Sequence, residues 1–277
     1  MAIRQPSVDK ERESMQVIKT SRPAPGVLMI ELSDPPANTY THQMFRQMDA
    51  AILEARFDDE ISVILITGEG EKFFCAGANI KMLEESNPHW KYFFCLHANE
   101  TLSRLEQTPK LVVAGLNGHT VGGGLEIAMA ADIRIARRDA GRCGLPEVNL
   151  GVLPGTGGTQ RLARMIGKSR SIELMCSGRL FSFEEAHDWG IVNEIYDGDA
   201  KSFREQMIDY CKQFTLPNKA TKVIGNIKRS VQSGTEIPFE YGLALERELQ
   251  KALFDSQDAK EGLNAFNSKR TPSFKGV

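Results

Sequence analysis

The most informative stretch of the chain is residues 114–126, which read Ala114-Gly115-Leu116-Asn117-Gly118-His119-Thr120-Val121-Gly122-Gly123-Gly124-Leu125-Glu126. The glycine run at 122–124 precedes a short apolar segment that is typical of a helix. Glycine lets a backbone N–H approach a ligand without a Cβ in the way, and a helix N-terminus adds partial positive charge. Taken alone, the run fits an anion-binding turn and an ordinary tight turn equally well.

Glu126 favours the functional interpretation. Residues 127–131 are all apolar, so this carboxyl is expected to be buried rather than solvated. A second carboxyl, Glu147, lies in residues 144–158, which read Gly144-Leu145-Pro146-Glu147-Val148-Asn149-Leu150-Gly151-Val152-Leu153-Pro154-Gly155-Thr156-Gly157-Gly158. Two carboxyls can divide acid and base work, and a glycine-lined backbone can present N–H groups to an oxyanion. The two segments together predict chemistry on a carbonyl compound.

Two further segments leave alternatives open. Residues 155–159 open a predicted helix at 160–166 and could bind a phosphate or simply turn the chain. Residues 73–81 read Phe73-Phe74-Cys75-Ala76-Gly77-Ala78-Asn79-Ile80-Lys81 and connect a predicted strand to a predicted helix. They could supply a second N–H to an oxyanion or form a common strand-to-helix turn.

Several familiar motifs are excluded. Residues 167–169, Gly-Lys-Ser, are not a phosphate-binding P-loop, because that motif needs a glycine where Leu162 stands. Residues 118–124 lack the glycine spacing of a dinucleotide-binding turn. The five histidines show no metal-ligand spacing, and no Gly-x-Ser-x-Gly elbow marks a serine nucleophile.

Hydrophobic periodicity predicts an α/β layer structure followed by helices. Strand and helix patterns alternate up to about residue 196, with predicted strands at 26–32, 61–67, 110–115 and 132–136 and predicted helices at 41–57 and 125–131. Four helical patterns then follow, at 201–214, 218–231, 239–254 and 259–268. We therefore expect a loose N-terminal arm at 1–15, a core at 16–197 and a helical region at 198–277.

Composition bounds the class of protein. The chain has 277 residues, 41% hydrophobic and 25% charged, with a formal net charge of −2. The absence of a basic stripe argues against nucleic-acid binding, and no apolar run reaches the roughly 18 residues of a membrane span. Five scattered cysteines without a C-x-x-C pair argue against a zinc site or disulfide framework. With no signal-peptide pattern at the N-terminus, we expect a cytoplasmic protein.

The segments at 75–81, 117–126 and 145–162 together resemble the enoyl-CoA hydratase/isomerase (crotonase) superfamily, and the similarity covers about residues 20–270. The resemblance implies a crotonase-like spiral of ββα units with a helical C-terminal trimerisation region. It further implies homotrimers, which in this family often pair into hexamers. The expected substrate is an acyl-CoA. No metal or redox cofactor is expected, and CoA enters as part of the substrate.

The resemblance also assigns individual residues. The backbone N–H groups of Ala78 and Gly123 would form the oxyanion hole, and Glu126 and Glu147 would be the two catalytic carboxyls. Further implied roles lie at the CoA: Ala76 and Lys81 beside it, and Phe266 and Lys269 reaching it from a neighbouring subunit. One departure is Asn79, where many hydratases carry Asp. In the same family, the stretch that includes Phe93 and Phe94 helps to line the acyl pocket, although these rings could equally pack a helix onto the core.

The implied reaction is hydration of an enoyl-CoA to the 3-hydroxyacyl-CoA through an oxyanion-stabilised enolate. We assign Glu126 as the base and Glu147 as the acid, with exchanged or shared roles left open. The alternatives are an enoyl-CoA isomerase, other CoA-thioester enolate chemistry, or a non-catalytic binding relative. Retention of both glutamates favours the enzyme.

Overall fold

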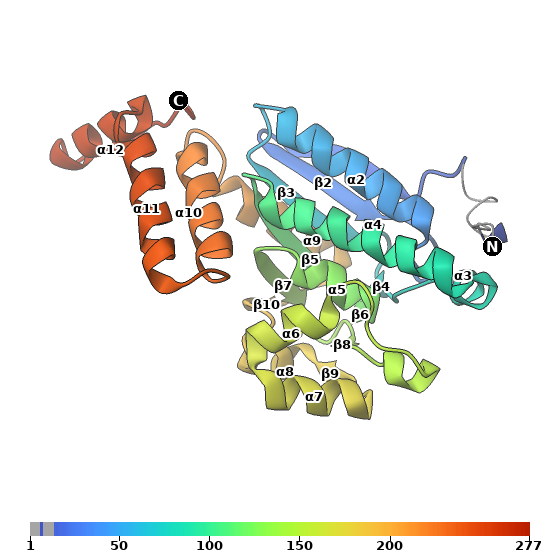
Figure 1. The fold of residues 1–277 in the computed structure, drawn as a ribbon. Coiled ribbons are helices and arrows are strands. Elements are labelled where there is room, and N and C mark those ends of the chain that lie inside the picture. Colours follow the sequence, from blue (N-terminus) through green and yellow to red (C-terminus); the bar gives the residue numbers. More distant parts are fainter. Residues whose placement is uncertain (1–5, 8–13) are drawn as a thin grey trace.

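The computed structural model describes residues 6–7 and 14–277. Most of the predicted N-terminal arm at 1–15 therefore lies outside the described residues. The described chain forms two sheets with helices packed around them, so the predicted α/β class is confirmed (Figure 1). Within these residues, no helix is both long enough and apolar enough to cross a membrane.

The larger sheet forms the structural centre of the chain. Its strands lie in the order β1-β2-β3-β5-β7-β10, with the bounds Ile18–Ala24, Val27–Leu32, Val63–Gly68, Leu111–Leu116, Ile133–Arg137 and Glu194–Tyr196. β1 and β2 form an antiparallel pair, and the other neighbours are parallel. Every residue of β3 and β5 is buried. Their sequences are therefore apolar runs without alternation, as expected for parallel strands covered on both faces.

A smaller sheet repeats the same order along the chain. It contains β4 (Phe73–Cys75), β6 (His119–Val121), β8 (Arg142–Gly144) and β9 (Phe181–Ser182), and the first three are parallel neighbours. Each of β3, β5 and β7 in the larger sheet is followed by one of these three strands and then by a helical segment. The chain therefore winds as a spiral of ββα turns, and the fold implied by the resemblance is confirmed.

Helices cover both faces of the larger sheet. α2 (His42–Phe57) and α4 (Pro88–Gln107) pack on one face, and α9 (Ala200–Lys212) packs on the other. α9 contributes Phe203, Met207 and Cys211 to a buried cluster with β2, β3 and β5. Although α9 lies inside the predicted helical region at 198–277, its contacts are with the core. The shorter helical segments are α3 (Ile80–Glu85), α5 (Gly123–Met129), η1 (Glu147–Leu150), α6 (Gly158–Ile166), α7 (Lys168–Ser177) and α8 (Phe183–Asp188).

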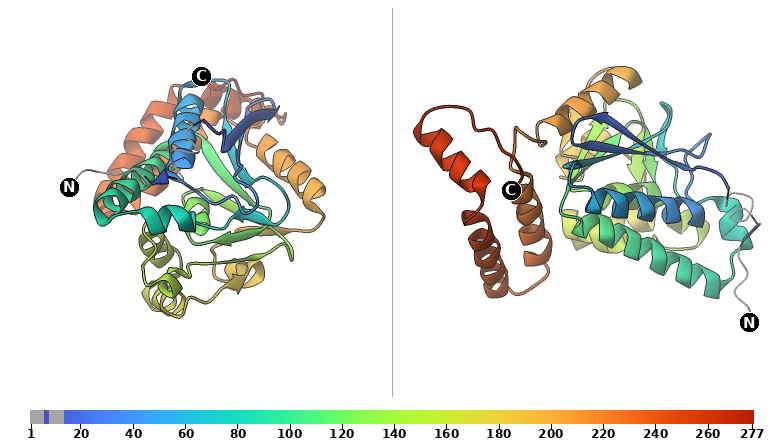
Figure 2. Two further views of the ribbon diagram at one scale, coloured as in Figure 1. Left: turned by 90° about the vertical axis from the view of Figure 1, so that its right-hand side faces the viewer. Right: turned by 90° about the horizontal axis from the view of Figure 1, so that it is seen from above.

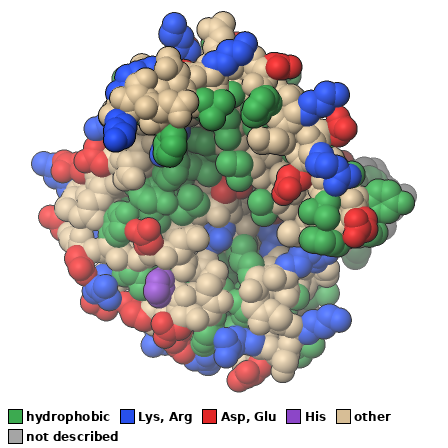
Figure 3. Space-filling view, turned by 90° about the vertical axis from the view of Figure 1, so that its left-hand side faces the viewer, with side chains coloured by type: hydrophobic (Ala, Val, Ile, Leu, Met, Phe, Trp, Pro, Cys, Tyr) green, Lys and Arg blue, Asp and Glu red, His purple; other side chains and the backbone are tan. Residues whose placement is uncertain are grey.

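The last three helices extend to one side of the two sheets, and the first of them packs against the core (Figure 2). They are α10 (Thr221–Gly234), α11 (Phe239–Phe254) and α12 (Gln257–Asn267). No residue of α11 is buried. Their exposed large apolar side chains are Ile227, Val231, Phe239, Tyr241, Phe254, Leu263 and Phe266. Figure 3 shows apolar side chains gathered around a hollow on this side of the molecule. Ile227 and Val231 line a pocket together with the core residues Leu111 and Met129.

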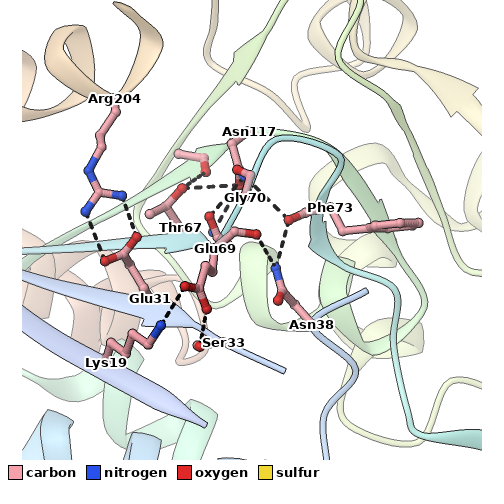
Figure 4. A network of polar contacts seen from close by, with 12 residues as sticks. Lys19, Glu31, Ser33, Asn38, Thr67, Glu69, Gly70, Phe73, Asn117 and Arg204 are labelled. Atoms are coloured by element: carbon pink, nitrogen blue, oxygen red, sulfur yellow. Dashed lines mark hydrogen bonds and ion pairs between the residues drawn. The ribbon is translucent and has the colours of Figure 1, made fainter. Parts of the chain in front are cut away.

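A polar network fixes the loop between β3 and β4, which leads into residues 76–78 (Figure 4). The side-chain amide of Asn38 donates to the carbonyl oxygens of Glu69 at 2.9 Å and Phe73 at 3.0 Å. The amide of Asn117 donates to the carbonyl oxygens of Gly68 at 3.0 Å and Gly70 at 2.9 Å. Both asparagines are buried. The loop is therefore held by the segments that lead to Tyr40 and to the glycine run.

Candidate active site

The segments that end β4 and β6 lie against each other. The two strands are parallel neighbours, so residues 76–78 and 122–124 leave the small sheet at the same edge. A Cβ on Gly77 would lie 3.4 Å from the backbone nitrogen of Gly123, and a Cβ on Gly124 would lie 2.1 Å from the carbonyl oxygen of Cys75. Glycine is required here because the two backbones approach too closely for side chains.

Both predicted oxyanion donors sit on these adjoining segments. Gly123 is the first residue of α5, so its N–H has no acceptor within the helix. The backbone on either side of Ala78 is hydrogen-bonded to Tyr40. The Tyr40 N–H donates to the carbonyl oxygen of Gly77 at 2.9 Å, and the Asn79 N–H donates to the carbonyl oxygen of Tyr40 at 3.0 Å. Neither the Ala78 N–H nor the Gly123 N–H donates to another described backbone group.

Glu126 is buried in the first turn of α5 and is held by the loop at 155–158. One carboxylate oxygen accepts from the backbone N–H of Thr156 at 2.8 Å and of Gly158 at 2.7 Å. The Thr156 hydroxyl donates to the other oxygen. A Cβ on Gly158 would lie 2.9 Å from the first oxygen. The loop, which from sequence could bind a phosphate or turn the chain, therefore presents its donors to Glu126.

Glu147 begins η1 and lies against the same glycine run. A Cβ on Gly122 would lie 2.8 Å from its Oε1. Its Oε2 is buried and has no hydrogen-bond partner among the described residues. Burial, reinforced by the charge of Glu126, raises the pKa of Glu147 to about 7. The structure therefore brings the two predicted carboxyls near each other, with Glu147 against Gly122 and in surroundings that contrast with those of Glu126.

Two residues of this region were missed by the sequence reasoning. Tyr40 is buried, and its ring occupies the position that a side chain on Gly123 would take, since a Cβ there would lie 1.9 Å from the ring atom Cε1. Lys91 of α4 lies with its Nζ 5.0 Å from the centre of the Phe94 ring, and its charge acts to lower the pKa of Glu147. No pattern in the chain marks either residue, because the contact of Tyr40 with Gly123 and the proximity of Lys91 to Glu147 arise only when distant segments meet.

The residues predicted beside CoA occupy two separate places. Ala76 is half-buried and donates its N–H to Ala37 at 3.0 Å, and Lys81 is exposed on α3. Asn79 caps α3, because its side-chain oxygen accepts from Met82 N–H at 3.1 Å. Phe266 and Lys269 are exposed at the end of α12, on the opposite side of the molecule from α3 (Figure 1). Within one chain, α12 and α3 are therefore not brought together.

The two phenylalanines of α4 differ in their surroundings. Phe94 is buried and stacks on Trp90 with ring centres 5.2 Å apart and on Tyr40 at 5.9 Å. Phe93 is 45% exposed and contacts His89. Cys95, one residue further along α4, lies 3.2 Å from the position of a Cβ on Gly155. Phe94 therefore packs the core, and α4 faces the loop at 155–158 through Cys95.

Known proteins resemble this chain over nearly its full length. Residues 22–277 match the family described as enoyl-CoA hydratase/isomerase. A probable enoyl-CoA hydratase of Bacillus subtilis is 36% identical over 256 residues, which cover 90% of this chain and 95% of that protein. The short-chain-enoyl-CoA hydratase of Clostridium acetobutylicum is 34% identical and covers 88% and 92%. A crystal structure of an enoyl-CoA hydratase from Geobacillus kaustophilus has a TM-score of 0.91 at 42% identity, covering 95% of this chain and 98% of that chain.

Proposed function

The chain belongs to the enoyl-CoA hydratase/isomerase family, and on that premise we propose that it hydrates an α,β-unsaturated enoyl-CoA thioester to the 3-hydroxyacyl-CoA. One observation carries the proposal. Glu147 lies against Gly122 of the glycine run, and Glu126 lies in the first turn of the helix that this run opens, close enough for its charge to act on Glu147. Hydration needs a proton taken from water and a proton given to the α-carbon, and two carboxyls can meet both needs.

The oxyanion hole would act on the thioester oxygen. As water adds to the β-carbon, the double-bond electrons move toward the carbonyl and charge builds on that oxygen as an enolate. The N–H groups of Ala78 and Gly123 would stabilise this charge, and losing one such donor typically costs about 10²–10³ in rate. Their placement on adjoining backbone segments supports this role, because fixed donors need no rearrangement during the reaction.

The surroundings of the two carboxyls support different roles. Glu126 meets three donors from the loop at 155–158, which complement a negative charge. We assign it as the base that takes a proton from water as the oxygen bonds to the β-carbon. The pKa of Glu147 is raised to about 7, so this carboxyl is partly protonated at neutral pH. We assign it as the acid that delivers a proton to the α-carbon.

CoA would enter as part of the substrate, and the proposal requires no resident metal or redox cofactor. Ala76 and Lys81 lie near Ala78 in the chain and would contact CoA in the same subunit. Phe266 and Lys269 would reach it from a neighbouring subunit. We further propose a homotrimer, or a hexamer of two trimers. The absence of any buried residue in α11 supports this, because its apolar side chains lack a core in the single chain. Sedimentation of the intact chain as a stable monomer would contradict it.

A direct assay tests the proposed reaction. The loss of absorbance from the conjugated double bond of crotonyl-CoA and longer enoyl-CoAs should report hydration, and product analysis separates a 3-hydroxyacyl-CoA from a shifted double bond. Glu126→Gln and Glu147→Gln should each fold normally and lose most of the activity, since general acid–base groups typically contribute about 10²–10⁴ in rate. Near-wild-type hydration by Glu147→Gln would favour a one-carboxyl isomerase. Absence of turnover with every enoyl-CoA would favour a binding protein.

A further inference from the structure

Tyr40 holds the peptide that precedes the Ala78 N–H. Its own N–H donates to Gly77 at 2.9 Å, and its carbonyl oxygen accepts from Asn79 at 3.0 Å. These bonds form an isolated bridge on either side of Ala78. The direction of the Ala78 N–H is therefore set by the backbone of Tyr40.

The ring of the same residue packs on the other oxyanion donor. A Cβ on Gly123 would lie 1.9 Å from the ring and 2.5 Å from the hydroxyl oxygen, so the phenol rests directly on this glycine. The ring itself is held by Phe45 at 5.1 Å, edge to face, and by Phe94 at 5.9 Å, stacked. Tyr40 is only 4% exposed. Movement of Gly123 toward the ring is therefore blocked by a well-packed aromatic group.

The hydroxyl of Tyr40 lies near Thr156, the residue that holds Glu126 through both its N–H and its hydroxyl. Burial raises the pKa of Tyr40 well above its usual range, so the phenol keeps its proton. Because the Thr156 hydrogen is donated to Glu126, the Thr156 oxygen can accept from Tyr40. Such chains of hydrogen bonds strengthen one another.

We propose that Tyr40 is a positioning residue that couples the oxyanion hole to the general base, with its backbone on Ala78, its ring on Gly123 and its hydroxyl on Thr156. The inference rests on the proposed function, from which it takes the roles of Ala78, Gly123 and Glu126. A core-filling role alone would not need the hydroxyl, because burying an unpaired hydroxyl is costly and leucine or phenylalanine would pack as well. The coupling would hold the oxyanion donors and the Glu126 carboxyl in a fixed relative geometry as substrate binds.

Two substitutions separate the hydroxyl from the ring. Tyr40→Phe keeps the ring and removes the hydroxyl that we propose donates to Thr156. We expect kcat to fall about five- to tenfold with KM within about twofold, as for the loss of one hydrogen bond. The kcat–pH profile should also differ from that of wild type, because Thr156 would hold Glu126 less firmly. Tyr210→Phe removes a half-buried phenol on α9, which packs on the other face of the larger sheet, and should change none of these quantities.

Tyr40→Leu removes the ring as well and should affect the oxyanion hole directly. Binding of acetoacetyl-CoA gives a readout independent of hydration, because the ultraviolet band of its enolate reports stabilisation of a thioester enolate. We expect Tyr40→Leu to weaken that band and Tyr40→Phe to retain it. Phe183→Leu, a buried aromatic truncation on α8, controls for loss of stability and should leave the band unchanged.

The outcomes distinguish the two proposals. If both Tyr40 variants match wild type in kcat, pH profile and enolate band, or differ only in thermal stability as Phe183→Leu does, the coupling is wrong. Suppose that wild type stabilises the enolate and Tyr40→Leu does not, but that wild type hydrates no enoyl-CoA. The coupling of Tyr40 to the oxyanion hole then holds, and the hydratase proposal fails. A wild-type protein that stabilises no enolate overturns both.

Discussion

Glu126 lies close enough to Glu147 for its charge, together with burial, to raise the pKa of Glu147 to about 7. The asymmetry comes from their partners: Glu126 accepts hydrogen bonds from Thr156 and Gly158, whereas Oε2 of Glu147 has none from the described residues. The carboxyl of Glu147 is therefore expected to be mostly protonated below neutral pH, beside a neighbour that is surrounded by hydrogen-bond donors. Such paired environments are a common way of separating acid and base roles.

The pH dependence of turnover should follow from the raised pKa. If protonated Glu147 is the acid, kcat should be high below about pH 7 and decline above it. Lys91 lowers the pKa of Glu147, so Lys91→Met should move the basic limb to higher pH. The kcat–pH profile for hydration of crotonyl-CoA measures the decline in wild type and its shift in Lys91→Met. Lys168→Met, at an exposed position on α7, is the control. A basic limb that does not move would remove Lys91 from this role.

The same shift predicts an effect on folding stability with a definite sign. The folded pKa of Glu147 lies above the ordinary value of 4.5, so the folded state binds the proton more tightly and loses stability as pH rises from about 4.5 to about 7. Glu147→Gln removes this loss. The variant should melt a few degrees higher than wild type at pH 8, because each kcal/mol of unfolding free energy raises Tm by about 2–4 °C. The difference in Tm should disappear near pH 4.5.

Thermal unfolding across this pH range measures the stability effect. Glu173→Gln, at an exposed position on α7, provides the matched control and should show no difference from wild type at any pH. A Glu147→Gln variant that is less stable than wild type at pH 8 would mean that the carboxylate makes favourable contacts in the folded protein.

Gly158→Ala should disturb the loop around Glu126 without abolishing folding. The new methyl group would lie 2.9 Å from Oε1 of Glu126, so the carboxylate or the loop must shift and the hydrogen bond from the residue 158 N–H must lengthen. We expect kcat to fall by about ten- to a hundredfold, the scale of a small misplacement of a catalytic group. Gly234→Ala, at the end of α10, meets only a contact of 3.9 Å and should be nearly silent. Circular dichroism tests whether Gly158→Ala folds, and kcat tests whether its site is disturbed. A folded Gly158→Ala variant with unchanged kcat would show that the site tolerates movement of Glu126.

Lys269→Glu tests the proposed contribution of a neighbouring subunit to CoA binding. CoA phosphates carry several negative charges while the chain has a net charge of −2, so a few local lysines would have to meet them. KM should rise for every acyl-CoA alike with kcat nearly unchanged, because the contact is the same in ground and transition states. The effect should shrink with added salt. Lys260→Glu, also exposed on α12, is the control, and an unchanged KM for Lys269→Glu at low salt would place Lys269 outside the site.

Sequence predicted the elements whose burial gives a clear period. The predicted helix at 239–254 coincides with α11, and the predicted strand at 61–67 lies within two residues of β3. β1 was missed because most of its side chains are exposed and polar, so it has no apolar pattern. The strands of the small sheet were not predicted as strands because they span only two or three residues.

The candidate site was predictable where chemistry and local sequence coincide. The apolar residues after Glu126 predicted that this carboxyl would be buried, and it is buried in the first turn of α5. The contact of Tyr40 with Gly123 could not be predicted, since it depends on how the segment before α2 meets the small sheet. The donors at 155–158 illustrate the same limit: their local geometry suits any anion, and only the fold shows that the anion is the protein's own carboxylate.

The asparagine network around the β3–β4 loop has a consequence for how readily this protein can be diversified. Asn38 and Asn117 bind backbone carbonyl groups, which every amino acid supplies, rather than the side chains of residues 69–73. Side chains at exposed positions such as 71 and 72 can therefore be exchanged while the path of the loop, and the placement of Ala78 beyond it, stays fixed. Substitutions in the β3–β4 loop therefore leave the geometry of the site unchanged, so this loop can be varied in evolution or in a library.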